Sequence, residues 1–201
     1  MNKKYVQEAK EEINRIDASR NYVDIMYEVA AVITTLMDKL DDHPEKINRP
    51  IIVGGLSLEF HTDSAYTTRD IDFVTSASLE MPSILHELGF KKEARIFIHD
   101  KLNIAVDIAN SSLEYSESYS RIIKVKVGKN YFYVVSPEDI LIDRILDYSY
   151  ADNYDYCLLL IANKFEALDV DYIRDKIKWD KSALNEFENI LDKIEHELNK
   201  D

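Results

Sequence analysis

The sequence has 201 residues, of which 46% are apolar and 31% are charged, and this is enough for one folded unit with a sizeable core. Its formal net charge of −13 disfavours broad, charge-driven binding to nucleic acid, because such binding neutralises phosphates with Lys and Arg. The lone Cys157 excludes an internal disulfide, and no apolar leader or bilayer-length apolar run is visible, so we expect a cytoplasmic protein without membrane contact.

The first half of the chain predicts two helices followed by a short strand-helix-strand unit. The helices are expected at residues 4–18 and 20–41, where a polar run at 41–43 and Pro44 end the second. The second helix has an apolar stripe at three- and four-residue steps that faces a core: Val23, Met26, Tyr27, Ala30, Ile33, Met37 and Leu40. The strand-helix-strand unit covers residues 50–53, 56–61 and 70–75, with a polar loop at 62–69.

The second half predicts one more helix, a group of β-rich runs and a helical C-terminal region. A helix at 79–88 has Pro82 in its first turn and Gly89 after its end. The β-rich runs are residues 90–98, 102–109 and 122–135, and the last of them contains a hairpin signal at 128–130. Ser136, Pro137 and the two acids after them are typical of a helix start. The helices expected from there on cover 137–148, 153–167, 169–178 and 181–199.

These elements predict an α+β fold, in which a small mixed sheet is flanked by helices. Residues 1–48 would be the N-terminal helices, 49–135 the α/β core and 136–201 the C-terminal helical region. No low-complexity linker separates the three parts, so we expect them to pack as one unit.

The most informative stretch is residues 51–75, which contains a glycine pair and an acidic pair. Gly54 and Gly55, two of only four glycines, close an apolar run and open a helical segment. Asp70 and Asp72 point to the same face of a strand, about 6–7 Å apart at their Cα atoms. Two adjacent carboxylates favour a hard cation, because otherwise they repel each other. The glycine turn predicts a phosphate site and the acids predict its metal.

A third carboxylate, Asp107, belongs with this pair. Alternation in the run at 102–109 puts Leu102, Ile104, Val106 and Ile108 on one face and leaves Asp107 on the other, small-residue face. Three acids on adjacent strands beside a glycine turn indicate a phosphoryl-transfer site with two metal ions about 3.5–4 Å apart.

These residues resemble the signature of the DNA polymerase β-like nucleotidyltransferase superfamily, which has a glycine turn, an Asp-x-Asp pair and a third acid on a later strand. The resemblance covers roughly residues 50–160, and it is strongest to small prokaryotic members related to toxin and abortive-infection nucleotidyltransferases. The matching segments are Thr68-Arg69-Asp70-Ile71-Asp72-Phe73, Ser136-Pro137-Glu138-Asp139-Ile140 and the later pair Asp152 and Asp155. The chain departs from the group at Ser57, where Ala is common, and at Arg144, where Lys is common.

The resemblance implies transfer of a nucleoside monophosphate from a nucleoside triphosphate to an acceptor hydroxyl, with Mg²⁺ or Mn²⁺ as cofactor and release of pyrophosphate. Asp70 and Asp72 would hold both metals, and Asp107 would complete the one nearer the acceptor and take the acceptor's proton. Gly54 and Gly55 would hold phosphates, and the helices after Ser136 would shape the acceptor pocket. Protein, tRNA and small-molecule acceptors all remain open.

Several residues have a second interpretation. Ser57 is either a phosphate donor at the helix start or an ordinary surface serine, and Arg69 contacts either phosphate or a neighbouring carboxylate. His61 is better explained as a helix-end residue than as a ligand. Cys157 lies in an apolar run and is expected to be buried and not nucleophilic.

Two other functions also fit the sequence. The first is a binding module that binds nucleotide without transferring it. The second is the toxin of a defence pair, held by a protein antitoxin through its helical flanks. Magnesium-dependent nucleotide binding without pyrophosphate release would distinguish the first, and growth arrest that depends on Asp70 would distinguish the second.

Overall fold

The computed structural model describes residues 2–41, 49–63, 66, 68–113, 121–147 and 153–198, and these form eight helices and a seven-stranded sheet. The expected α+β fold is therefore confirmed. The helices are α1 (Lys3–Arg15), α2 (Tyr22–Leu40), α3 (Gly54–His61), α4 (Met81–Glu87), α5 (Pro137–Leu146), α6 (Asn153–Lys164), α7 (Val170–Ile177) and α8 (Lys181–Leu198). The strands are β1 (Ile51–Val53), β2 (Asp70–Val74), β3 (Lys91–Glu93), β4 (Ile96–His99), β5 (Ile104–Asn110), β6 (Ile123–Val127) and β7 (Asn130–Val134).

The sheet is mixed, with the strand order β3-β4-β5-β2-β1-β7-β6. Strands β2 and β5 run parallel, as do β1 and β7, and the other neighbours are antiparallel. The β-rich run at 90–98 divides into two strands, because Ala94 adopts a φ of 53° and the chain turns back there. The predicted hairpin in the last run is present, with Gly128 and Lys129 between β6 and β7.

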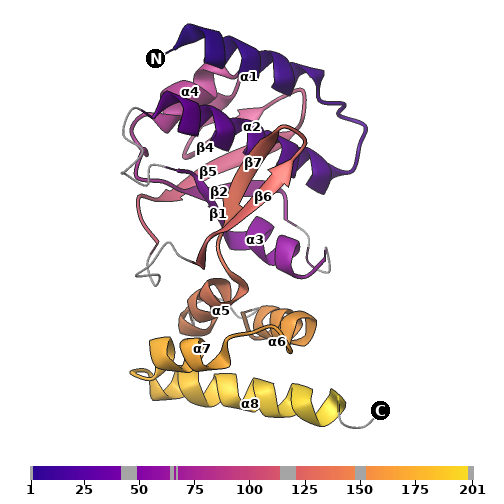
Figure 1. Cartoon of the computed structure of the whole chain (residues 1–201), viewed down its shortest axis with the longest axis vertical. Coiled ribbons are helices and arrows are strands. Elements are labelled where there is room, and N and C mark those ends of the chain that lie inside the picture. The colour runs from indigo at the N-terminus through magenta and orange to yellow at the C-terminus, as the bar shows by residue number, and fades with distance from the viewer. Residues whose placement is uncertain are drawn as a thin grey trace.

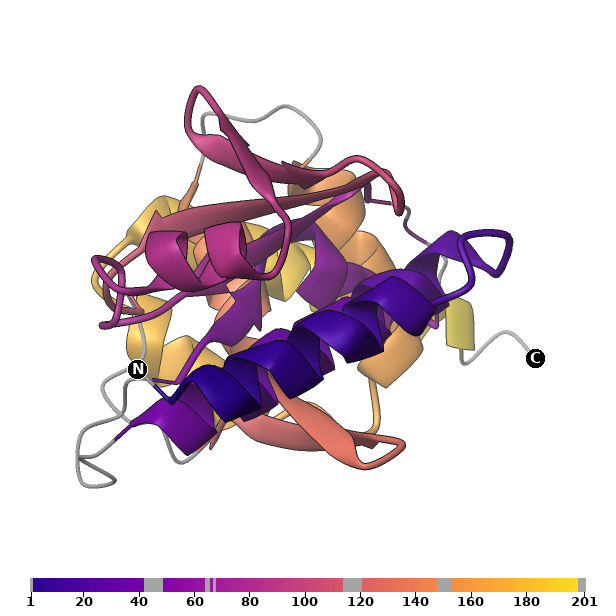
Figure 2. The same ribbon diagram turned by 90° about the horizontal axis from the view of Figure 1, so that it is seen from above.

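The helices cover the sheet from two sides (Figure 1). Helices α1, α2 and α4 pack with the sheet in one hydrophobic cluster, and Figure 2 shows α1 and α2 running across it. Helices α5 to α8 form a second cluster, which includes Ile51, Leu58 and Val135 from the sheet and α3. Helix α3 thus lies between the sheet and the C-terminal helices.

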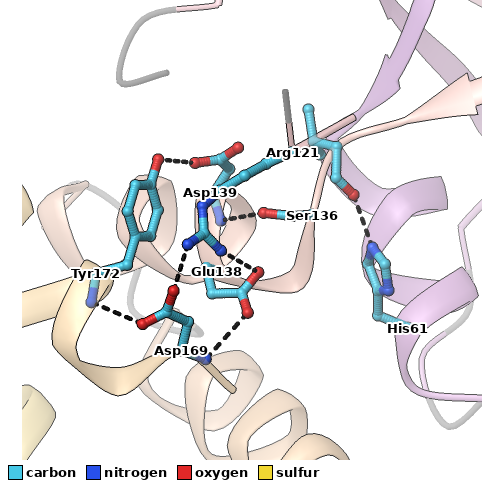
Figure 3. Close-up of polar contacts among 8 residues, drawn as sticks. His61, Arg121, Ser136, Glu138, Asp139, Asp169 and Tyr172 are labelled. Carbon is cyan, nitrogen blue, oxygen red and sulfur yellow. Dashed lines mark hydrogen bonds and ion pairs between the residues drawn. The ribbon is translucent and has the colours of Figure 1, made fainter. Parts of the chain in front are cut away.

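The start of α5 is fixed by the cap that the sequence predicts. The Ser136 hydroxyl accepts a hydrogen bond from the Asp139 N–H (3.2 Å), and Pro137 occupies the first turn. One residue earlier, the Val135 carbonyl accepts from His61 Nε2 (2.8 Å; Figure 3), and burial lowers the pKa of His61. His61 therefore joins the end of α3 to the strand-helix junction, as expected for a helix-end residue.

A group of polar contacts ties α5 to α7 (Figure 3). Arg121 pairs with Asp169 and with Glu138, and Glu138 also accepts from the Asp169 N–H (3.1 Å). The Tyr172 hydroxyl donates to Asp139 Oδ1 (2.8 Å). These contacts fix the first turn of α5 relative to α7.

We expect the native Cys157 thiol to be chemically inert. It is 2% exposed within the second hydrophobic cluster, and burial raises its pKa to about 12. Only the thiolate reacts with iodoacetamide, and at pH 8 a thiol with this raised pKa is almost entirely protonated. Native protein should therefore react at least about a hundredfold more slowly than protein unfolded in guanidinium chloride. Mass spectrometry of the intact chain measures both rates. Equally fast labelling of the native protein would contradict the burial of this side chain.

Among the described helices, none has both the length and the apolar character needed to cross a bilayer. Of the later acidic pair, Asp155 lies exposed in the first turn of α6, and Asp152 is outside the described residues.

Candidate functional site

Strand pairing brings the three predicted acids to one place. Strands β2 and β5 are parallel, and the register sets Asp72 directly opposite Asp107 and Asp70 opposite Ala105. Adjacent strands lie about 4.8 Å apart, and side chains directly opposite each other point to the same face. Asp70, Asp72 and Asp107 therefore share one face at the centre of the sheet, as the alternation in each strand predicts.

The glycine turn lies against this face because β1 is the other neighbour of β2. The last residue of β1, Val53, pairs with Asp72, so Gly54 lies immediately beside this acid. Gly54 has a φ of 59°, and a Cβ at this position would lie 2.3 Å from Asp72 Oδ2. A Cβ at Gly55 would lie 2.7 Å from the Thr68 hydroxyl oxygen. Both positions thus need glycine to let polar side chains of the site approach the backbone.

Each acid contacts a donor of the protein. The Thr68 hydroxyl donates to Asp70 Oδ1 (2.9 Å), the Gly55 N–H donates to Asp72, and Arg95 Nε lies 3.4 Å from Asp107 Oδ2. Neither Thr68 nor Arg95 is among the site residues that the sequence predicts. Thr68 precedes Asp70 by two residues, so strand periodicity would have found it. Arg95 carries no local signal, since only the pairing of β4 with β5 brings it to Asp107.

The electrostatics of the site favour a cation. Burial, followed by the charges of Asp70 and Asp107, raises the pKa of Asp72 to about 6. The nearby Arg144, whose guanidinium lies 5.9 Å from the Tyr156 ring centroid, acts in the opposite direction. Mutual repulsion of this kind is relieved when a divalent cation binds between the carboxylates.

The donor set is chemically suited to Mg²⁺ or Mn²⁺, which prefer carboxylate oxygens. Within the described part of the chain, no three His, Cys, Asp or Glu side chains already converge as metal ligands. The carboxylates of Asp70 and Asp107 contact Thr68 and Arg95 instead. Binding of a cation by all three acids would therefore require Asp70 and Asp107 to exchange these protein donors for the ion.

Two of the predicted phosphate-binding residues, Ser57 and Arg69, do not line the cavity that Asp72 and Asp107 share. Ser57 is 0% exposed, and its hydroxyl donates to the Gly54 carbonyl (2.7 Å), so it stabilises the turn from within α3. Arg69 is exposed, and its carbonyl accepts from the Tyr22 hydroxyl (2.7 Å). Neither residue is among the described residues that line the cavity, and of the other predicted site residues Gly55 and Asp70 are also absent from that lining, whereas Gly54, Asp72 and Asp107 belong to it.

That cavity has a volume of about 510 Å³, which suits a small-molecule ligand. Its sheet side includes Gly54, Asp72, Arg95 and Asp107, together with the end of β5. The pairing of β2 with β5 shifts after Phe73, so Ile108, Ala109 and Asn110 all line the cavity and the simple alternation expected for this strand ends there. The other side includes Asp139, Ile140 and Asp143 of α5.

The mixed sheet, the aspartates that share one face of β2 and β5, the adjacent glycine turn and the ligand-sized cavity agree with the class of protein that the family comparison shows, the nucleotidyltransferases. More particularly, the chain belongs to the family described as nucleotidyltransferase of unknown function (DUF6036), whose model matches residues 28–196. No protein with a curated description matches the chain.

Proposed function

We propose that the protein transfers a nucleoside monophosphate from a nucleoside triphosphate to an acceptor hydroxyl in a Mg²⁺-dependent reaction. The observation that carries the proposal is the register that sets Asp72 beside Asp107, both of which line the cavity, with Asp70 on the same face of the sheet. Family membership supports nucleotidyl transfer in general.

The chain's own residues would hold the substrates and move one proton. Asp70, Asp72 and Asp107 would bind Mg²⁺, which when bound supplies charge neutralisation at the phosphates. The N–H groups at the start of α3 would hold the phosphates, apart from that of Gly55, which donates to Asp72.

Asp107 would accept the proton of the acceptor hydroxyl. The acceptor oxygen then forms a bond to the α-phosphorus, the bond between that phosphorus and the α–β bridging oxygen breaks, and pyrophosphate leaves. Arg95, which pairs with Asp107 and also lines the cavity, would be free to contact the triphosphate once the acids hold the cation.

The test is transfer of label from α-³²P nucleoside triphosphates by the purified protein with Mg²⁺ and a cell lysate. We expect a labelled product and pyrophosphate with wild-type protein and about a thousandfold less with Asp70→Asn, since the variant loses a metal-binding carboxylate. Labelling by the variant at the wild-type rate would refute the metal role. Magnesium-dependent nucleotide binding in calorimetry without pyrophosphate release would identify a binding module instead.

A further inference from the structure

Helix α3 contains one acidic side chain, Glu59, and this side chain is buried. Glu59 is 1% exposed, and its neighbours Leu58 and Phe60 pack in the two hydrophobic clusters. Burial raises the pKa of the Glu59 carboxyl, and the one group that lowers it, among the described residues, is a backbone N–H. A buried acid that no cation neutralises is costly, so its place in the core requires an explanation.

The donor of this hydrogen bond is the backbone N–H of Thr68, which lies 3.1 Å from Glu59 Oε2. Thr68 belongs to the segment that enters β2, two residues before Asp70. Glu59 thus joins the middle of α3 to the start of the strand that carries the acidic pair.

Thr68 contacts both halves of the site. Its hydroxyl donates to Asp70 Oδ1 (2.9 Å), and a Cβ on Gly55 would lie only 2.7 Å from the same hydroxyl oxygen and 3.0 Å from Thr68 Cβ. Thr68 is itself 7% exposed. The position of this one residue therefore determines how closely the start of β2 approaches the glycine turn.

The backbone position of Thr68 matters more than its bond to Asp70. An ion bound by Asp70 would take the place of the Thr68 hydroxyl, whereas the close approach of Thr68 to Gly55 involves no metal ligand. Groups that bind a metal and its phosphates must be held to within about 0.5 Å by the residues behind them. Glu59 supplies such a hold from inside α3, through the Thr68 N–H.

We propose that Glu59 is a positioning residue for nucleotidyl transfer, which through the Thr68 N–H fixes the distance between the glycine turn, where the phosphates would bind, and Asp70, where the metal would bind. This inference rests on the proposed function and deepens it. Glu59 is not among the described residues that line the cavity, so it acts through Thr68 and not by contact with the substrate.

The first measurement needs no variant. Hydrogen exchange of ¹⁵N-labelled wild-type protein, followed by NMR, reports on each backbone amide. A Thr68 N–H that donates to a buried carboxyl should exchange at least about a hundredfold more slowly than an unprotected amide. Exchange at the unprotected rate would overturn the inference.

The second measurement compares three variants at Glu59 by calorimetry with Mg²⁺ and the α,β-methylene analogues of the four common nucleoside triphosphates. Glu59→Gln keeps an oxygen that accepts from Thr68, whereas Glu59→Met and Glu59→Leu put an apolar group in its place. We expect the two apolar variants to bind the analogue about tenfold to a hundredfold more weakly, and Glu59→Gln to stay within about threefold of wild type. Protection of the Thr68 amide should follow the same order.

The matched control is Thr62→Val. Thr62 is 1% exposed at the end of α3, and its hydroxyl donates to the Leu58 carbonyl (2.8 Å), so this buried hydrogen bond stays within the helix and its cap. Thr62→Val should lower thermal stability and leave the affinity for the Mg²⁺-analogue unchanged. The same pattern in Glu59→Met and Glu59→Leu, with lower stability and wild-type affinity, would show a purely structural role and overturn the inference.

Failure of this inference is distinguishable from failure of the proposed function. Wild-type protein that binds none of the analogues with Mg²⁺ refutes the proposed function, and the role of Glu59 with it. Wild-type protein that binds an analogue no more tightly than Glu59→Met and Glu59→Leu do overturns the role of Glu59 alone.

Discussion

Asp72→Asn is expected to lower nucleotidyl transfer by about a thousandfold or more and, at the same time, to stabilise the metal-free protein. The loss of activity follows from the proposed metal role, because a carboxylate that holds a catalytic ion supplies several kcal/mol of transition-state stabilisation. The gain in stability follows because ionised Asp72 is held next to Asp70 and Asp107.

The sign of the pH dependence can be worked out from the pKa of Asp72, which rises from 3.8 to about 6 on folding. Below about pH 4 the carboxyl is protonated in both states, so variant and wild type should be equally stable. Between pH 4 and 6 the Asp72 carboxyl ionises in the unfolded chain but stays largely protonated in the folded protein. The wild-type protein therefore loses stability relative to Asp72→Asn as the pH rises through this range. Above pH 6 the difference should level off at about 1–3 kcal/mol in favour of Asp72→Asn.

Chemical denaturation in EDTA at pH 4, 6 and 8 measures this difference, and thermal shifts with Mg²⁺-nucleotide measure the loss of binding. The charge-matched control is Asp155→Asn, at an exposed position at the start of α6, which should stay within about 0.5 kcal/mol of wild type and retain activity. A destabilised Asp72→Asn at pH 8 would contradict the repulsion among the three acids.

Gly54→Ala is expected to destabilise the protein by about 3 kcal/mol and to abolish most transfer activity. The methyl group adds strain at a φ of 59° and would lie 2.3 Å from Asp72 Oδ2, so either the turn or the carboxylate must move. Because Gly54 also lines the cavity, a displacement of either group changes the site directly.

Gly128→Ala separates the backbone strain at positive φ from the close approach of the new methyl group to Asp72. Gly128 has the same φ of 59°, in the turn between β6 and β7, but a Cβ there meets nothing within 4 Å. Gly128→Ala should lower the free energy of unfolding only by the cost of the left-handed conformation, about 1–2 kcal/mol, and should keep full activity. Urea unfolding and steady-state transfer of both variants provide the comparison. Equal losses of stability and equal activities would show that Asp72 does not depend on the open space at Gly54.

Much of the fold follows from local signals. The capped start of α5 at Ser136 and the hairpin at Gly128 occur where the sequence predicts them, because a capping hydroxyl and a glycine with positive φ act within a few residues. The division of the run at 90–98 was not predicted, since Ala94 has no turn signal and its φ of 53° is imposed by the pairing of β3 with β4.

The site shows the same division between local and distant information. Strand periodicity places Asp70 and Asp72 on one face, and it gives Asp107 the correct face of its own strand. The hydrogen bond from the Ser57 hydroxyl to the Gly54 carbonyl, however, depends on the conformation of the first turn of α3. The contact of Arg95 with Asp107 depends on the pairing of β4 with β5.

By itself the sequence determined the periodicities, the caps and the residue types of this protein: an α+β chain with a glycine turn and three acids. Only the tertiary structure decided that β5 pairs with β2 in the register that sets Asp107 beside Asp72, and that α5 presents Asp139 to the same cavity. The physical reason is that local sequence fixes the direction of a side chain relative to its own backbone. Which backbones become neighbours is set by burial of the whole apolar surface, to which residues far apart in the chain contribute together.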